Sequence, residues 1–365
     1  MNGQVFSSDV VGTSTSRRRF LQSLAVGVGA SVLFGESAMA LSISEPRTPP
    51  ARLPTALVYD EMNRCHVSPK TKPECPERYE VVLAALKKSE CFSSLRAYRA
   101  RAATEKEILA CHSDKYLARV RREIESGAKR LSSGDTWVCR KSLLAAGYAC
   151  GAACVAVDAV LDGKVANAFC LARPPGHHAT PDRGMGYCIF NNAGVAARYA
   201  QRKRRVGRVL IVDWDVHHGN GTQDIFYDDP SVFYFSTHQS PWYPWTGKKD
   251  ETGHGKGLGT TLNCPFSRGA GRKEFMAAFR DKLAPAVSRF KPELIILSAG
   301  FDSRHGDPLG RFELTDRDYR DLTGLVLEMA RQNAKGRVVS ILEGGYNLAG
   351  LGKAAAAHIE RLSQG

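Results

Sequence analysis

The sequence has no Cys-x-x-Cys pair among its ten cysteines, which lie between Cys65 and Cys264. Such pairs mark thiolate zinc sites, and closely spaced cysteines in a short chain mark disulfide-stabilised domains. Cys150 and Cys154 lie one helical turn apart in a stretch rich in alanine and glycine, where cysteine serves as a small apolar packing residue. The pattern therefore excludes both a disulfide framework and a thiolate zinc site.

Beyond its N-terminal segment the sequence also lacks an apolar run of the roughly 18–20 residues that a membrane-spanning helix needs. We therefore expect no transmembrane span in the mature chain. Apolar residues make up 43% of the 365 residues. That share is enough for the core of one large α/β domain or of two smaller ones.

The chain is strongly basic, with a net charge of +14, but no nucleic-acid-binding motif accompanies the charge. Its densest basic run, residues 202–205, contains no interleaved aromatic residues. This pattern is typical of the solvated end of a helix before a strand. We expect no direct binding of nucleic acid.

The N-terminus resembles a twin-arginine export signal. Ser-Arg-Arg-Arg-Phe-Leu-Gln at 16–22 precedes an apolar stretch at 24–35 and then Ala38-Met39-Ala40, a small-x-small cleavage pattern. We expect a targeting segment at 1–40, a linker at 41–54 and a folded domain at 55–365. The expected destination is a bacterial periplasm, and the alternative is a plastid, thylakoid or other organelle.

The remaining sequence alternates short apolar runs with longer helical patterns. Strands are predicted at 56–59, 166–171, 209–213, 294–298 and 338–342, and helices at 76–88, 104–125, 142–161, 191–204 and 272–290. Continuous apolar runs are typical of parallel strands covered on both faces. The pattern predicts one doubly wound α/β domain, with its site at the carboxyl ends of the strands.

Polar side chains follow these strands where each one ends. Asp213, Asp215 and His217 come directly after one buried run, and alternation places them on one side of an extended segment. Asp302 follows the next run and reaches the same edge of the sheet. Oxygen and nitrogen donors suit a divalent metal, and three protein ligands leave a position open for water and substrate.

Two further strand ends carry groups suited to proton transfer. His177 and His178 follow a rigid Pro-Pro-Gly turn, which suggests placed acid–base groups. Gly344 and Gly345 permit a sharp turn that directs the phenol of Tyr346 into a cleft. The glycine pair alone is weak support, but its position after a fourth strand strengthens it.

Five segments, in this order and spacing, resemble the histone deacetylase and acetylpolyamine amidohydrolase superfamily. They are Arg-Pro-Pro-Gly-His-His at 173–178 and residues 186–192, 213–223, 298–302 and 342–346. The resemblance covers about residues 55–365 and is nearer to class II members of bacterial and plant-organelle type. It implies an arginase-like fold and zinc-dependent hydrolysis of an acetyl-amide.

The resemblance also implies a role for each site residue. Asp215, His217 and Asp302 would bind zinc. His178 would be the general base toward the attacking water and the proton donor to the leaving amine, and His177 its electrostatic partner. The remaining implied catalytic residues are Asp213 orienting His177, Asn220 orienting His178, and Tyr346 stabilising the oxyanion.

A substrate tunnel and a second cation are implied in the same way. The tunnel would be formed by Gly186, Tyr187, Tyr243 or Trp242, and Leu309, with Asp135 at its rim. Class I relatives have Asp at the position of Asn220, and most relatives have Phe at that of Tyr187. A structural potassium ion would be bound by Asp213, Asp215, His217, Ser236 and Thr237.

Several functional alternatives stay open. The acetylated amine could be acetyl-lysine in a protein or a small molecule such as an acetylpolyamine or an N-acetylated arylalkylamine. Trp242, Tyr243 and Trp245 make an aromatic rim that suits an aromatic amine. An inactive acyl-amine-binding module would lack a zinc ligand or Tyr346, and a two-manganese ureohydrolase would need extra Asp and His ligands. The sequence does not determine the oligomeric state.

Overall fold

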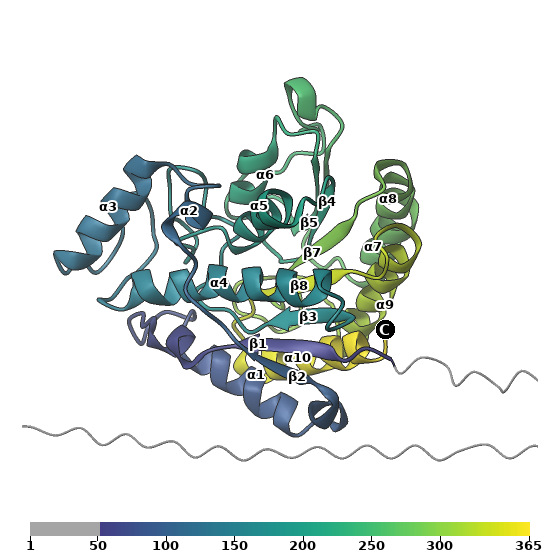
Figure 1. The fold of residues 1–365 in the computed structure, drawn as a ribbon, viewed down its shortest axis with the longest axis horizontal. Coiled ribbons are helices and arrows are strands. Elements are labelled where there is room, and N and C mark those ends of the chain that lie inside the picture. Colours follow the sequence, from purple (N-terminus) through teal and green to yellow (C-terminus); the bar gives the residue numbers. More distant parts are fainter. Residues whose placement is uncertain (1–51) are drawn as a thin grey trace, which may run out of the picture. The chain divides into compact units, whose positions relative to one another are not determined.

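Eight strands form one parallel sheet in the computed structural model, which describes residues 52–365 (Figure 1). The strands are β1 (Thr55–Tyr59), β2 (Arg96–Arg99), β3 (Asn167–Cys170), β4 (Val209–Asp213), β5 (Val232–Gln239), β6 (Thr261–Phe266), β7 (Leu294–Ala299) and β8 (Val338–Leu342). The predicted targeting segment and linker residues 41–51 lie outside the described residues.

The strand order is β2-β1-β3-β8-β7-β4-β5-β6, and every neighbouring pair is parallel. The four strands that lead into the predicted site segments, β3, β8, β7 and β4, are consecutive at the centre of the sheet. Because parallel strands end at the same edge, the four segments meet there. The order of the strands along the chain also reverses in this region, which is where open α/β sheets bind ligands.

Helices cover both faces of the sheet (Figure 1). They are α1 (Glu77–Lys87), α2 (Glu105–Ile108), α3 (Asp114–Glu125), α4 (Ser142–Leu161), α5 (Asn192–Arg204), α6 (Asn220–Phe226), α7 (Arg272–Ala277), α8 (Ala284–Phe290), α9 (Asp316–Asn333) and α10 (Leu348–Ser363). Along β4, Leu210 and Val212 pack in the core with α1 and α7–α10. Val209 and Ile211 pack with α4, α5 and α6. Burial on both faces explains why β4 has no polar alternation before its end.

Most predicted elements are confirmed, one predicted helix is wrong, and one confirmed helix contains a π turn. The segment 104–125 is not one helix, because α2 ends at Ile108 and α3 begins only at Asp114. The Ser113 side chain caps the new helix by accepting from the Tyr116 amide at 3.2 Å. The segment 272–290 is helical throughout but widens to a π turn at 278–283. Pro285, which lacks an N–H, follows this turn and cannot donate to a regular α-helical bond.

Helix α4 qualifies the expectation about membrane spans. Among the helices of residues 52–365, α4 alone is long enough and apolar enough to cross a membrane, and its mean hydropathy is 1.8. However, 72% of that window is buried inside the protein. Its alanines pack against the sheet, so the apolar character is explained by its place in the core.

A buried ion-pair network joins the start of the segment after β3 to the region around the first turn of α1. Glu74, fully buried, accepts from Arg173 Nε at 2.7 Å and Nη2 at 2.9 Å, and from Arg78 Nη1 at 3.3 Å. Burial alone raises the pKa of Glu74, but Arg173 and His66 outweigh it and hold the pKa well below its usual value. Arg173 begins the turn that carries the paired histidines. The network therefore anchors the start of that turn.

We expect Glu74→Gln to destabilise the fold by about 3–5 kcal/mol, because it leaves two buried guanidinium groups without their carboxylate. A carboxyl whose pKa is lowered on folding stabilises above its unfolded pKa of about 4.3, and this contribution is lost as the pH falls. The variant's deficit in thermal unfolding should therefore shrink below about pH 4. Glu328→Gln, which alters an exposed acid paired with Arg331, is the control. Equal melting temperatures for the two variants at pH 7 would contradict the prediction.

Candidate active site

Three potential metal ligands converge at the carboxyl ends of β4 and β7. One ligand atom from each of Asp215, His217 and Asp302 lies within 4.8 Å of the others, and all three residues are buried. His217 Nδ1 is 3.0 Å from Asp215 Oδ1 and 3.3 Å from Asp302 Oδ2. β4 and β7 are adjacent and in register from Val209–Leu294 to Asp213–Ser298, which brings their following residues together.

The chemistry of this cluster fits a divalent cation. Asp302 Oδ2 is buried, and apart from the ion-pair contact with His217 Nδ1 at 3.3 Å it has no hydrogen-bond partner among residues 52–365. A Cβ on Gly344 would lie 2.1 Å from Asp302 Oδ2 and 2.5 Å from Asp215 Oδ2, so only glycine leaves the carboxylates room. Burial and the Asp215 charge raise the pKa of Asp302 to about 7. Two buried carboxylates and one imidazole match the ligand preferences of zinc.

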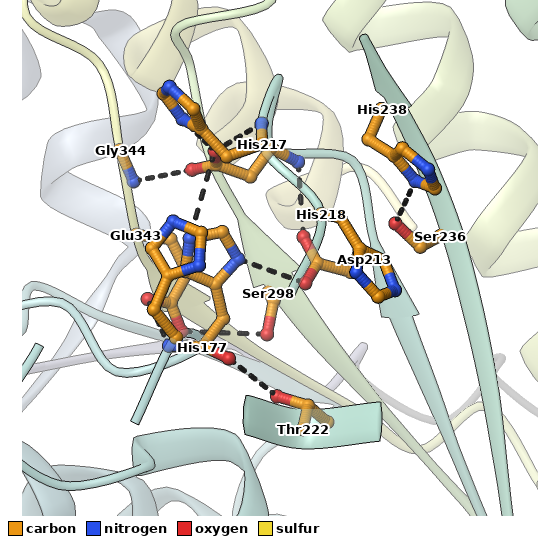
Figure 2. Close-up of polar contacts among 12 residues, drawn as sticks. His177, Asp213, His217, His218, Thr222, Ser236, His238, Ser298, Glu343 and Gly344 are labelled. Carbon is orange, nitrogen blue, oxygen red and sulfur yellow. Dashed lines mark hydrogen bonds and ion pairs between the residues drawn. The ribbon is translucent and has the colours of Figure 1, made fainter. Parts of the chain in front are cut away.

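The paired histidines have different environments, as Figure 2 shows for His177 beside Asp213. His177 Nδ1 lies 3.1 Å from Asp213 Oδ2. Burial opposes its charging, yet Asp215 and Asp213 raise the pKa of His177 to about 10. Burial, together with the neighbours His177 and His217, lowers the pKa of His178 well below its usual value. The two carboxylates therefore favour the charged form of His177 and burial favours the neutral form of His178, which suits a stabiliser and a base.

Asn220 fixes the tautomer of His178. The amide Oδ1 of Asn220 lies 2.8 Å from His178 Nδ1. An amide oxygen only accepts, so Nδ1 carries the hydrogen and Nε2 keeps its lone pair. His178 also lines the pocket described below, where Nε2 can act as a base.

Tyr346 is presented by the turn after β8. Gly345 has φ of +119°, a backbone conformation that favours glycine. The amide of Gly344, which is labelled in Figure 2, donates to Asp215 Oδ2 at 2.8 Å. The guanidinium of Arg78 lies 4.8 Å from the centre of the Tyr346 ring. The turn thus ties the backbone that precedes Tyr346 to a candidate metal ligand.

A pocket of about 320 Å³ leads to these groups. Its lining residues are Asp135, His178, Gly186, Tyr187, His217, Trp242, Tyr243, Trp245, Pro308, Leu309 and Tyr346. All six residues named for the tunnel and its rim are among them, including both alternatives, Tyr243 and Trp242. A larger groove of about 650 Å³ beside α3 and α4 contains none of the predicted site residues.

The model of the histone deacetylase domain matches residues 72–362. The chain belongs to the histone deacetylase family. The family resemblance inferred from the sequence is confirmed. The chain is therefore a hydrolase that acts on acetyl-amides.

Individual relatives agree with this family assignment. Histone deacetylase 10, chloroplastic, from Oryza sativa subsp. japonica is 39% identical over 300 residues, covering 78% of this chain and 68% of that protein. Polyamine deacetylase HDAC10 from Homo sapiens is 39% identical over 84% of this chain, which spans only 48% of that protein's length. The solved HDA15 HD domain matches with a TM-score of 0.79 and 38% identity, covering 84% of this chain and 90% of that one. The predicted deacetylase fold is confirmed.

Sequence reasoning missed several residues of the site. Glu343 accepts from the amides of Gly176 at 2.6 Å and His177 at 3.1 Å, and so holds the histidine turn. The Tyr234 hydroxyl donates to Asp213 at 3.1 Å. Glu343 could have been found, since it is an acid at the end of a buried run. Tyr234 lies within β5, which the sequence analysis did not predict.

Proposed function

We propose that this histone deacetylase family member hydrolyses the acetyl-amide of an acetylated amine to acetate and the free amine. The ligands for the catalytic zinc would be Asp215, His217 and Asp302. The observation that carries the proposal is that His217, which clusters with Asp215 and Asp302, lines the same aromatic pocket as His178 and Tyr346. Ligands, base and oxyanion donor form a complete hydrolytic set.

The protein's own groups would divide the reaction between them. Zinc, when bound, supplies Lewis acidity toward the acetyl carbonyl and toward water. His178 Nε2 takes the proton of the attacking water and returns it to the leaving amine nitrogen. The Tyr346 hydroxyl donates a hydrogen bond to the carbonyl oxygen as its negative charge grows. His177, whose charged form Asp215 and Asp213 favour, would act as the electrostatic partner of His178.

We also propose the potassium site, with Asp213, Asp215, His217, Ser236 and Thr237 as its residues. Asp213 and Ser236 are register partners on β4 and β5, and Thr237 follows on β5. Thr237 Oγ1 is buried with no hydrogen-bond partner among the described residues. A cation here would favour the charged form of the buried Asp213.

The alternative functions have less support. Every implied zinc ligand and Tyr346 are present, which disfavours an inactive binding module. Within residues 52–365 one cluster of three metal-ligating side chains is found, whereas a two-manganese ureohydrolase needs ligands for two ions. The substrate class is still divided between acetyl-lysine in proteins and small acetylated amines. The similarity to a polyamine deacetylase and the aromatic rim both favour small amines.

The test is an acetate-release assay on the chain lacking residues 1–40. Its panel is an acetyl-lysine peptide, acetylputrescine, acetylspermidine and N-acetylserotonin, compared by kcat/KM. We expect hydrolysis that is lost on chelation and restored by zinc. Trp245, 72% exposed at the pocket mouth, supplies a second arm. If the rim selects aromatic amines, Trp245→Ala should lower kcat/KM for N-acetylserotonin more than for acetylputrescine. Failure of the zinc-loaded protein on the whole panel would refute the proposed function.

We further propose export of the folded protein through residues 1–40, with an organelle as the alternative destination. The arginine run, the apolar stretch and the Ala38-Met39-Ala40 pattern support it. A twin-arginine route carries folded proteins, so zinc could be bound before export.

A further inference from the structure

Asp307 connects two walls of the pocket but does not line it. Its Oδ2 accepts from the backbone amides of Tyr346 at 2.7 Å and Asn347 at 3.0 Å. Its Oδ1 accepts from the amide of Leu309 at 2.9 Å. The residue is only 4% exposed. One buried carboxylate therefore binds the backbone of the phenol and that of the tunnel wall.

The connection continues across the pocket mouth. The Leu309 carbonyl accepts from Trp242 Nε1 at 2.8 Å. Trp242 in turn accepts at its own carbonyl from the Trp245 amide, also at 2.8 Å. The segment after β7, the rim loop after β5 and the turn after β8 are thereby joined through Asp307 and Leu309.

The backbone of Tyr346 needs such a support. Gly345, with φ of +119°, is the most permissive residue type and precedes it directly. The hydroxyl lies at the far end of a long rigid side chain, so a small rotation at the Tyr346 backbone displaces the oxygen by more. Misplacing a catalytic group by about 1 Å can cost roughly 100-fold in rate. Hydrogen bonds to a charged acceptor are about twice as strong as neutral ones, which suits a carboxylate to this task.

We propose that Asp307 is a positioning residue that aims the Tyr346 hydroxyl at the reacting carbonyl and sets its distance from the Leu309 wall. The inference rests on the proposed role of Tyr346 as oxyanion donor. Asp307 itself touches neither substrate nor metal ligands in this scheme, and it acts through the backbone amides that it accepts from.

The experiment is a double-mutant cycle of Asp307→Asn and Tyr346→Phe on the zinc-loaded protein. Asparagine keeps the shape of the side chain but has only one acceptor oxygen. Its NH2 group must therefore take the place of the other oxygen and face backbone N–H donors. We expect Asp307→Asn alone to lower kcat by roughly tenfold or more, with KM nearly unchanged. In the Tyr346→Phe background the same change should cost little further, because the hydroxyl that Asp307 aims is already absent.

Asp318→Asn is the matched control. Asp318 is also 4% exposed and accepts from the Thr315 amide at 2.8 Å, but it caps α9 away from the pocket. It should lower the melting temperature and leave kcat unchanged. If Asp307→Asn does not fold, Asp307→Glu carries the same prediction, since it keeps the charge and displaces the carboxylate.

The outcomes separate this inference from the proposed function. If Tyr346→Phe alone leaves kcat unchanged, the oxyanion role itself fails. If Tyr346→Phe lowers kcat, but Asp307→Asn costs the same factor in both backgrounds or leaves kcat unchanged in the wild type, only the positioning role is overturned. A loss confined to melting temperature or to KM would likewise overturn it.

Discussion

The Asp302→Ala variant is expected to bind no zinc and to release no acetate above background. Catalytic zinc sites use three protein ligands, and this change leaves only Asp215 and His217. Asp302 comes from the segment after β7, whereas the other two follow β4, so the variant loses the whole contribution of the β7 segment to the proposed ligand set. The same loss is expected for Asp215→Ala, which also removes the acceptor of the Gly344 amide.

Metal analysis after dialysis is the direct measurement, because it does not depend on choosing the right substrate. Asp318→Asn, altering a buried carboxylate outside the site, should keep its full zinc content. Since Asp302 Oδ1 accepts from the Val216 amide at 2.9 Å, thermal unfolding should be recorded to establish that the variant is folded. A full complement of zinc in folded Asp302→Ala would refute the ligand set.

The sequence predicted the central part of this architecture because its signals are local. Four buried strands appear as continuous apolar runs, and the polar residues directly after them reveal the edge where they meet. Asp215 and Asp302 are 87 positions apart, yet each could be found from its own strand end. Parallel pairing then makes their proximity a consequence of topology.

One part that was not predicted, β5, does carry a local signal, because Val-Phe-Tyr-Phe at 232–235 is a buried apolar run. Other parts that were not predicted lack such signals. β2 is an Arg-Ala-Tyr-Arg edge strand with largely exposed side chains, so no apolar run marks it. Asp307 and Glu74 act through contacts with residues far away in the sequence, such as Tyr346 and Arg173. Neither has a spacing pattern that distinguishes it from a surface acid. Only the tertiary fold shows that each is buried.

Tyr346→Phe is expected to lower kcat by roughly 100- to 1,000-fold, the usual cost of losing one oxyanion donor. The phenylalanine ring can keep the same place, since the ring packs near Arg78 and 5.7 Å from Tyr187. Burial raises the pKa of Tyr346 well above its ordinary value, so the wild-type hydroxyl stays protonated and able to donate. The loss should therefore lie in kcat, with zinc content and melting temperature retained.

Tyr319→Phe is the matched control for this change. Tyr319 is fully buried, and its hydroxyl has no hydrogen-bond partner among residues 52–365. Its ring packs against Trp214 and Phe301, which precede the candidate ligands Asp215 and Asp302 in the chain, and it does not line the pocket. Removing its hydroxyl should leave kcat unchanged, so a large difference between the two variants isolates hydrogen-bond donation into the pocket. Equal kcat for Tyr346→Phe and wild type would mean that the carbonyl oxygen is stabilised without the phenol, leaving that work to the metal and to His177.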